Sequence, residues 1–149
     1  MYEKFGQFID GNWSPSSNKE TYKVINPATE EVLGHASKAT PVDVDRALKS
    51  AEKGLAIWRK TPPWQRAYTL RKIADKVREK KDVLAKWMTL ENGKPLAEGV
   101  GETNGAADIF EWNAEETKRI YGQIVESRFE DTRVHVYYQP IGVVAALSP

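Results

Sequence analysis

The stretch YYQPIGVVAALSP, residues 137–149, decides the fold class. From Ile141 to Leu147 nearly every residue is apolar, and only Gly142 interrupts the run. A short, valine-containing apolar run is typical of a strand that is buried on both faces, as in a parallel sheet covered by helices. Residues 140–149 are therefore predicted to contain a buried strand of a central parallel sheet.

The buried run is followed directly by Ser148 and Pro149, and few other segments of the chain could pair with it as neighbouring strands. A terminus is usually an exposed and loosely held part of a protein, whereas this one follows a strand that needs neighbours and covering layers. We therefore expect Pro149 to be an interruption, with most of the central sheet formed by other residues.

Four segments upstream carry the periodic apolar residues of helices, and the first two begin with capping residues. Thr40 suits a helix N-cap and Pro41 the first helical position, and an apolar stripe continues to Trp58. Thr61 is expected to cap the second helix, which starts at the prolines that follow and carries its stripe to Val77.

The third predicted helix covers about residues 82–91, and Asn92-Gly93 ends it because glycine tolerates the left-handed conformation past a helix end. The fourth is predicted to start at Pro95 and to reach about Tyr121. Glycines in its first half weaken the helix by up to about 1 kcal/mol each relative to alanine. We interpret them as a sign of close packing against a neighbour.

Short β segments flank the helices. The pair Asp10-Gly11 favours a type I′ turn and hence a small hairpin near the N-terminus. A second pair of short strands is predicted within TYKVINPATEEVLGHAS, residues 21–37. RVHVYYQ, residues 133–139, alternates and is rich in β-branched and aromatic residues, so it predicts a strand with one solvated face.

Composition limits the possible functions. The 149 residues have a net charge of +1, so no overall field recruits nucleic acid or an anionic membrane. No apolar run approaches the roughly 18 residues of a membrane span, and the N-terminus lacks a signal-peptide pattern. The chain has no cysteine, which excludes disulfides, zinc–thiolate sites and thiol nucleophiles within it. A cytoplasmic location is expected.

Two glycine-containing motifs resemble phosphate-binding sequences but depart from them. GVGETNG, residues 99–105, has the spacing G-x-G-x-x-x-G and follows a helix, whereas a dinucleotide fingerprint follows a strand. NGKP, residues 92–95, has proline where a P-loop has serine or threonine. Both are interpreted as helix packing or helix joints.

The charged clusters are interpreted as surface features. The basic residues between 71 and 81 could bind a membrane or an acidic partner, but acidic neighbours dilute them and favour a solvated face. Glu111, Glu115 and Glu116 form a carboxylate cluster, and Glu115 is spaced for surface pairing with Lys118 or Arg119. His35 and His135 are far apart in sequence and are not expected to bind metal. The residues alone therefore indicate an incomplete α/β protein without a catalytic cluster.

Four blocks resemble the NAD(P)-dependent aldehyde dehydrogenase family in their order and spacing, and together they span nearly the whole chain. The second and third are most similar to the succinate-semialdehyde dehydrogenase branch. The blocks are NPATEEVLGHAS (26–37), LENGKPLAEGVGE (90–102), EWNAEETKRIYG (111–122) and QPIGVVAALSP (139–149).

The resemblance implies an α/β fold with three parts. Residues 1–123 would form the N-terminal part of a cofactor-binding domain. Residues 124–139 would form a protruding β element used in oligomerisation. Residues 140–149 would form the first, truncated part of a buried strand in a Rossmann-like sheet.

The resemblance also implies an oxidoreductase that converts an aldehyde, succinate semialdehyde among the candidates, to a carboxylic acid with NAD or NADP. In the family a cysteine thiolate adds to the aldehyde, oxyanion donors stabilise the intermediate, and a glutamate activates water. These groups lie beyond residue 149 in the family, so the chain alone is expected to be inactive. The complete protein is expected to be a homodimer or homotetramer that binds neither nucleic acid nor membranes.

Site residues carry over from the resemblance by position. Leu147, Ser148 and Pro149 match the strand end that lines the cofactor site. Ile25 and Glu91 match positions that bind a structural monovalent cation in some members, although Glu91 also fits an ordinary surface helix position.

The fourth helix matches the wall of the family's substrate tunnel, with Gly105, Ile109 and Trp112 near that wall. Relatives often carry a bulkier residue at position 105, so a wider tunnel entrance is expected here.

Two alternatives remain open at this point. The first is a truncated, non-catalytic relative that acts as a binding or oligomerisation module, which the lack of cysteine favours. The second is an unrelated protein that binds partners through the basic helix.

Overall fold

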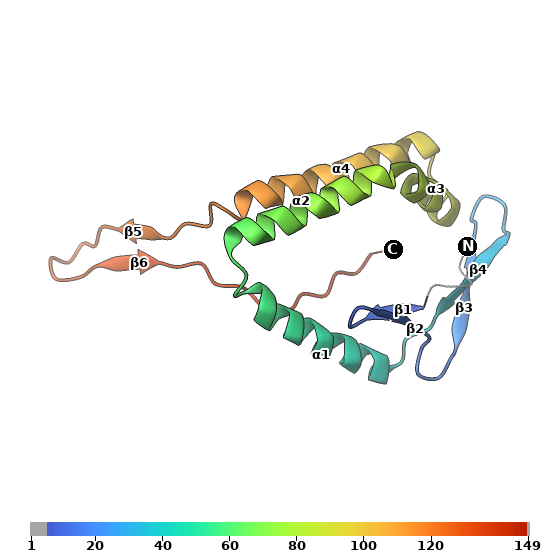
Figure 1. The fold of residues 1–149 in the computed structure, drawn as a ribbon, viewed down its shortest axis with the longest axis horizontal. Helices are drawn as coiled ribbons and strands as arrows, with labels where there is room; N and C mark the ends of the chain where they lie inside the picture. The colour runs from blue at the N-terminus through green and yellow to red at the C-terminus, as the bar shows by residue number, and fades with distance from the viewer. Residues whose placement is uncertain (1–5, 149) are drawn as a thin grey trace.

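The computed structural model of the chain describes residues 6–148 and joins three short antiparallel hairpins to a set of helices (Figure 1). This arrangement agrees with the predicted α/β class. The elements, in order, are β1 (Gln7–Ile9), β2 (Asn12–Ser14), β3 (Thr21–Ile25), β4 (Val32–Ser37), α1 (Pro41–Trp58), α2 (Pro63–Glu79), α3 (Lys81–Asn92), α4 (Leu96–Glu116), β5 (Gln123–Val125) and β6 (Val134–Val136).

The first hairpin has the predicted turn. Asp10 and Gly11 both have positive φ, at 54° and 77°, which is the conformation that a type I′ turn requires at its two central residues. β3 and β4 form the second hairpin, whose register shifts between Val24 and Ile25.

α1 begins with the predicted cap, and its capping box also anchors the preceding loop. The backbone N–H of Thr40 donates to Asp43 Oδ2 at 3.0 Å, and Thr40 Oγ1 accepts from the backbone N–H of Asp43 at 3.4 Å. The Asp43 carboxylate also accepts from the backbone N–H of Ser17, between β2 and β3. These bonds, led by the Thr40 N–H, lower the pKa of Asp43 to about 2.

The predicted cap of α2 is wrong. Pro62 occupies the N-cap position without a side-chain hydrogen bond, and the helix starts at Pro63. Thr61 stands one residue too early to cap α2, and its hydroxyl donates to the carbonyl of Ile57 at 3.0 Å. Thr61 therefore satisfies the end of α1.

α4 packs against both α2 and α3, and the fully buried apolar residues of these three helices are alanines. Small side chains allow helix backbones to approach closely. A methyl group added at Gly99 would lie 2.9 Å from the Ala85 carbonyl oxygen, which confirms close packing at the first glycine of GVGETNG. The prediction is wrong at Gly101 and Gly105, where an added methyl group would meet nothing within 4 Å. The buried alanines are Ala67, Ala74, Ala85, Ala107 and Ala114.

The helix ends follow local chemistry. Gly93 terminates α3 in the left-handed conformation, at φ 82°, as predicted. α4 ends at Glu116, earlier than the predicted Tyr121. The backbone N–H groups of Lys118 and Arg119 bond to carbonyls three residues back, so the chain tightens and leaves the α-helical path.

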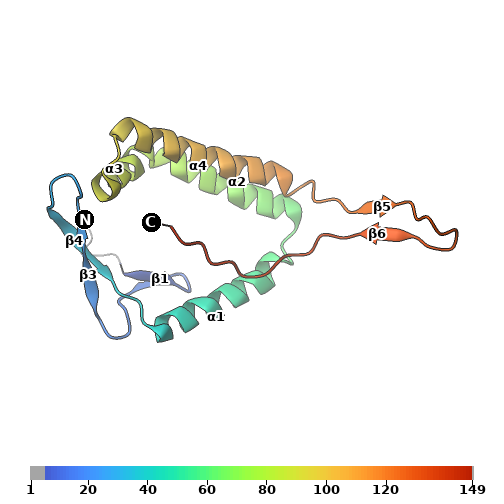
Figure 2. The same ribbon diagram turned by 180° about the vertical axis from the view of Figure 1, so that it is seen from behind.

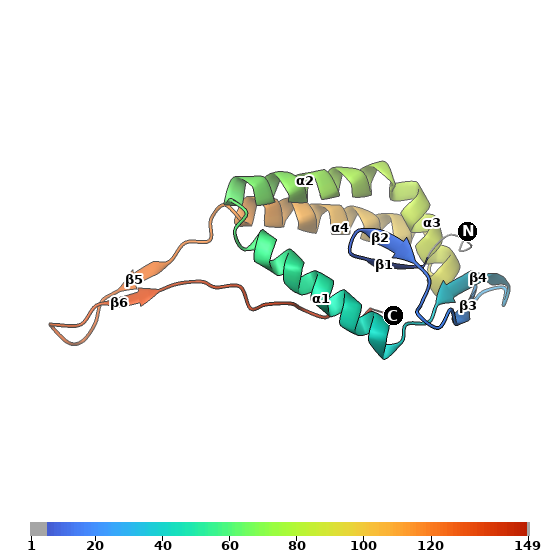
Figure 3. The same ribbon diagram turned by 60° about the horizontal axis from the view of Figure 1, so that its bottom comes forward.

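β5 and β6 form an antiparallel hairpin that protrudes beyond the ends of α2 and α4 (Figures 1 and 3). We call residues 123–139 the arm. The predicted strand over 133–139 forms only at Val134–Val136. Most residues of the arm are exposed.

The predicted buried strand does not form in this chain. Residues 139–148 have no regular secondary structure, and Ile141 and Leu147 are 94% and 97% exposed. The physical reason is that the described residues offer no neighbouring strand for this run. Figure 2 shows the segment turning back from the arm toward the N-terminal hairpins.

The described chain leaves much apolar surface uncovered. Its accessible surface is 11916 Å², whereas a compact monomer of this mass exposes about 7,700 Å². Exposed apolar residues lie on α1 and α4 as well as on the arm. None of the helices within residues 6–148 combines the length and the apolar character needed to cross a bilayer.

Candidate functional site

The described residues contain no group of three or more His, Cys, Asp or Glu placed to hold a metal ion. His35 lies on β4 and His135 on β6, both exposed, and the His135 ring stacks on Tyr137 with the ring centroids 6.1 Å apart. The two histidines thus lie on different hairpins.

Gly105, Ile109 and Trp112 lie on α4 at helical spacing, so they share one face of the helix. Ile109 and Trp112 are 65% and 70% exposed. A methyl group added at Gly105 would meet nothing within 4 Å. The structure thus brings the three predicted tunnel residues together as an open, largely apolar face.

Ion pairs fix the register of α4 against α2. Arg78 donates to Asp108 at 2.8 Å and to Glu111 at 2.6 Å, and these carboxylates raise the pKa of Arg78. Arg71 pairs with Glu115 one turn further along. The basic residues of α2 are thus partly neutralised by α4 carboxylates, which disfavours a free basic face.

Of the two predicted partners of Glu115, Lys118 forms the pair, with its Nζ 2.5 Å from a Glu115 carboxylate oxygen, whereas Arg119 pairs with Glu116. The same lysine lies 5.1 Å from the ring centroid of Trp64. This contact connects the start of α2 to the end of α4 near the base of the arm.

The turn that follows Ile25, the last residue of β3, lies beside the end of α3. Asn26 is buried, and its side-chain oxygen accepts from the backbone N–H of Ala28 at 2.9 Å. A methyl group added at Gly93 would lie 3.0 Å from Pro27 Cγ. The structure therefore places the turn after Ile25 close to the helix end that carries Glu91. A cation site at these two residues stays a prediction.

The predicted cofactor residues lie in the extended C-terminal segment. Leu147 and Ser148 are both exposed and belong to no strand, and Pro149 lies outside the described residues. The described residues by themselves therefore do not form a cradle that fits a dinucleotide.

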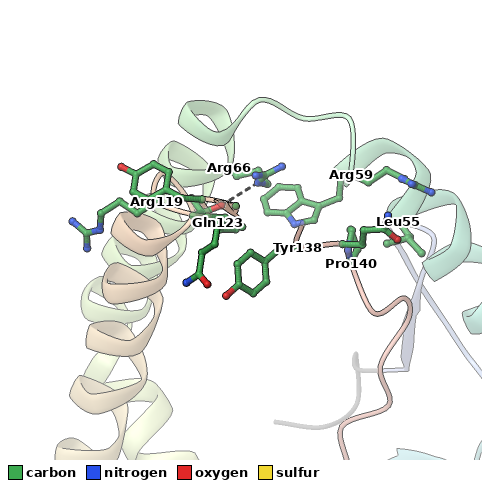
Figure 4. Close-up of a pocket in the computed structure, with 13 residues that line it drawn as sticks. Leu55, Arg59, Arg66, Arg119, Gln123, Tyr138 and Pro140 are labelled. Carbon is green, nitrogen blue, oxygen red and sulfur yellow. Dashed lines mark hydrogen bonds between the residues drawn. The ribbon is translucent and has the colours of Figure 1, made fainter. Parts of the chain in front are cut away.

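A cavity of about 1040 Å³ at the base of the arm was not predicted by any pattern in the sequence (Figure 4). It forms where the end of α1, the start of α2, the residues after α4 and both ends of the arm meet. Arg66 connects two of these parts: Nε donates to Thr117 Oγ1 at 3.0 Å and Nη1 donates to the Thr61 carbonyl at 2.8 Å.

Comparison with known proteins gives a consistent result. Residues 13–149 match the model of the aldehyde dehydrogenase family. The chain is 44% identical over 142 residues to glutarate-semialdehyde dehydrogenase of Pseudomonas aeruginosa, covering 95% of this chain and 29% of the relative. It is 43% identical over 141 residues to the NADP(+) succinate-semialdehyde dehydrogenase of Escherichia coli, covering 95% of this chain and 29% of the relative.

A solved structure agrees with these relatives. The chain superimposes on the crystal structure of succinate-semialdehyde dehydrogenase from Burkholderia pseudomallei with a TM-score of 0.84 and 39% identity. The match covers 90% of this chain and 28% of that one. The chain therefore spans less than a third of the length of the relatives it matches.

Proposed function

Because the chain belongs to the aldehyde dehydrogenase family, we propose that it is the N-terminal part of an NAD(P)-dependent enzyme that oxidises an aldehyde to a carboxylic acid. The match to the family model over residues 13–149 carries this proposal. The names of the similar proteins favour a semialdehyde substrate, such as succinate or glutarate semialdehyde.

Residues 1–149 would support the reaction without supplying its nucleophile, because the chain has no cysteine. The thiolate, the oxyanion-stabilising asparagine and the base that activates water would come from residues beyond 149. We accordingly propose that the chain alone does not oxidise aldehydes and that it contributes surfaces to the complete site.

The cofactor, NAD or NADP, accepts hydride when it is bound. Leu147, Ser148 and Pro149 would lie at the edge of its site, in agreement with the rule that ligands of open α/β sheets bind beyond the carboxyl ends of strands. The other groups that hold the cofactor would come from residues beyond 149.

The open face of α4 would form one wall of the substrate tunnel. Its exposed side chains, Ile109 and Trp112, suit the apolar body of an aldehyde. Gly105 would widen the entrance, because no atom fills the space into which a side chain at this position would point.

The arm would pair subunits of a homodimer or homotetramer. It presents unpaired strand edges and exposed side chains such as Ile124 and Tyr137, and an exposed edge is either protected or used for pairing. Ile25 and Glu91 would bind a structural monovalent cation through carbonyl and carboxylate oxygens. A cytoplasmic location completes the proposal.

A chimera tests this function. Residues 1–149 would be joined to the remainder of the Escherichia coli relative, and reduction of NADP would be followed by absorbance with succinate semialdehyde. We expect the chimera to be active and the chain alone to be inactive. A folded, oligomeric chimera without activity would contradict the proposed role. Aldehyde oxidation by residues 1–149 alone would contradict the proposal that the catalytic groups come from residues beyond 149, and the reaction would need a nucleophile other than cysteine.

A non-catalytic binding or oligomerisation module remains the alternative, and the protruding arm is the observation that favours it. An inactive chimera that still assembles through the arm would support this alternative.

A further inference from the structure

The cavity at the base of the arm has the size and lining of a small-molecule site. Its volume is about 1040 Å³, at the upper end of the roughly 300–1,000 Å³ that ligand sites occupy. Trp58, Ile120 and Tyr138 supply apolar and aromatic surface, and Gln123 and Arg66 supply polar groups.

Arg66 keeps unused hydrogen-bonding capacity in this cavity. A guanidinium carries five N–H donors. Nε donates to a hydroxyl, that of Thr117, and Nη1 donates to a backbone carbonyl, that of Thr61. Both acceptors are neutral. Within residues 6–148 no carboxylate pairs with Arg66, and Nη2 has no assigned acceptor.

Arg59, Arg128 and Arg133 also have no carboxylate partner among the described residues, but they are exposed, whereas Arg66 is half-buried. Arg46, Arg71, Arg78 and Arg119 each pair with an aspartate or glutamate. Arg66 is half-buried, so water compensates its charge less completely than it would at an exposed position. A half-buried cation held in place by neutral groups favours an anion as its missing partner.

The close-up identifies which polar groups face the cavity. In Figure 4 the guanidinium of Arg66 lies among the lining residues, whereas Arg59 and Arg119 extend away from it in opposite directions. The side chains of Gln123 and Tyr138 lie below Arg66 in the same view. Arg59 and Arg119 also line the cavity, but because their side chains extend away from it the site offers the guanidinium of Arg66 together with an amide and a phenol.

We propose that this cavity binds an organic carboxylate, with the carboxylate on Arg66 Nη2 and the body of the acid against Trp58 and Ile120. The planar guanidinium matches a carboxylate in shape, and charge-assisted bonds of this kind are about twice as strong as neutral ones. One cationic group suits a monovalent head group, and the apolar walls suit the carbon chain or ring of an organic acid.

The test measures binding and does not depend on catalysis, so its result is independent of whether the protein oxidises aldehydes. The isotope-labelled 149-residue chain is titrated with sodium succinate, glutarate or benzoate at constant ionic strength, with sodium chloride as the reference salt. Of the five tryptophan indole signals, that of Trp58 is assigned with Trp58→Phe. We expect this signal to shift saturably in the millimolar range with the carboxylates and not with chloride.

Substitutions separate the cavity from general charge. Arg66→Gln should weaken carboxylate binding at least tenfold. Arg59→Gln, which removes the same charge from a side chain that points away, should change it less than twofold. Since Arg66→Gln also removes two hydrogen bonds and could unfold the chain, Gln123→Glu provides a second variant. It adds a carboxylate beside Arg66 and should also weaken binding at least tenfold.

The outcomes are distinct. Stronger binding of succinate and glutarate than of benzoate would identify the product type of acid as the ligand, and the reverse order would identify another organic acid. Both orders support a carboxylate site. The absence of a saturable shift with any of the three acids would overturn the proposed carboxylate site. Unchanged binding in the Gln123→Glu variant would also overturn it, and so would equal weakening by Arg59→Gln and Arg66→Gln.

Discussion

The backbone N–H of Ser17 donates to both carboxylate oxygens of Asp43, at 3.2 and 3.1 Å, although 26 residues separate them in sequence. Asp43 is 1% exposed and also closes the capping box of α1 with Thr40. One carboxylate therefore fixes the N-terminus of α1 and the loop that precedes β3.

Asp43 makes the stability of the chain depend on pH in the acidic range. Its pKa falls from 3.8 to about 2 in the folded chain, so folding favours the charged form. This contribution to the free energy of unfolding is fully present above pH 3.8 and is lost as the pH falls through about 2. We expect urea midpoints of the Asp43→Asn variant to depend less on pH in this window than those of the unmodified chain.

The control for this prediction is Asp45→Asn, which removes a carboxylate from an exposed position of the same helix. It should keep the pH dependence of the unmodified chain. Equal pH dependence in the Asp43→Asn variant and the unmodified chain would show that the Ser17 and Thr40 bonds do not stabilise the charged form.

Gly99 should be a point where even a methyl group destabilises the fold. Gly99→Ala would place a methyl group 2.9 Å from the Ala85 carbonyl oxygen, so α3 and α4 would have to separate. We expect a loss of about 1–3 kcal/mol in the free energy of unfolding. Gly101→Ala is the matched control: nothing lies within 4 Å of its added methyl group, and it should stabilise α4 by about 0.5–1 kcal/mol. Urea denaturation of both variants measures these effects, and equal signs for the two would contradict the packing argument.

Gly105→Tyr should narrow the proposed tunnel without disturbing the fold, because the added side chain points into open space. In the active chimera we expect a KM for bulky aldehydes raised severalfold and a KM for small aldehydes that changes little. Ala106→Tyr, at an exposed neighbouring position on another face of α4, serves as the control. Unchanged kinetics in the Gly105→Tyr variant would remove the α4 face from the substrate path.

A charge on the arm should disrupt assembly. Ile124 is 78% exposed on β5, and burying an unpaired carboxylate in an interface costs several kcal/mol. Light scattering of the chimera should therefore show that Ile124→Asp dissociates the oligomer. Thr132→Asp adds the same charge between β5 and β6 and should leave the assembly intact if the strand faces form the contact. An unaffected Ile124→Asp oligomer would place the subunit contact elsewhere.

Local chemistry explains which features could be predicted from the sequence. The Thr40 cap, the Asp10-Gly11 turn and the Gly93 helix end depend on residues within a few positions of each other, and all three are confirmed. The Thr61 cap failed because two prolines move the start of α2 past it. The sequence pattern alone does not specify whether the Thr61 hydroxyl bonds to the helix before it or to the helix after it.

Features that depend on distant residues could not be predicted in the same way. Arg66 and Thr117 are 51 positions apart, and their bond depends on how the start of α2 lies beside the end of α4. The run from Ile141 to Leu147 has the apolar pattern of a buried strand, yet a strand forms only where a neighbour supplies hydrogen bonds. The tunnel and cofactor residues were proposed from the resemblance to a family. The periodicity and spacing of residues in this chain alone do not identify them.

The alanine interior between α2, α3 and α4 has a thermodynamic consequence. Five buried methyl side chains remove little apolar surface from water, while larger side chains such as Leu48 and Ile57 remain exposed on α1. Any molecule that covers those side chains binds the folded chain in preference to the unfolded one. By mass action, the melting temperature of the chain should therefore rise with the concentration of that molecule. The stability of the folded chain then depends on the concentration of its binding partner as well as on its own sequence.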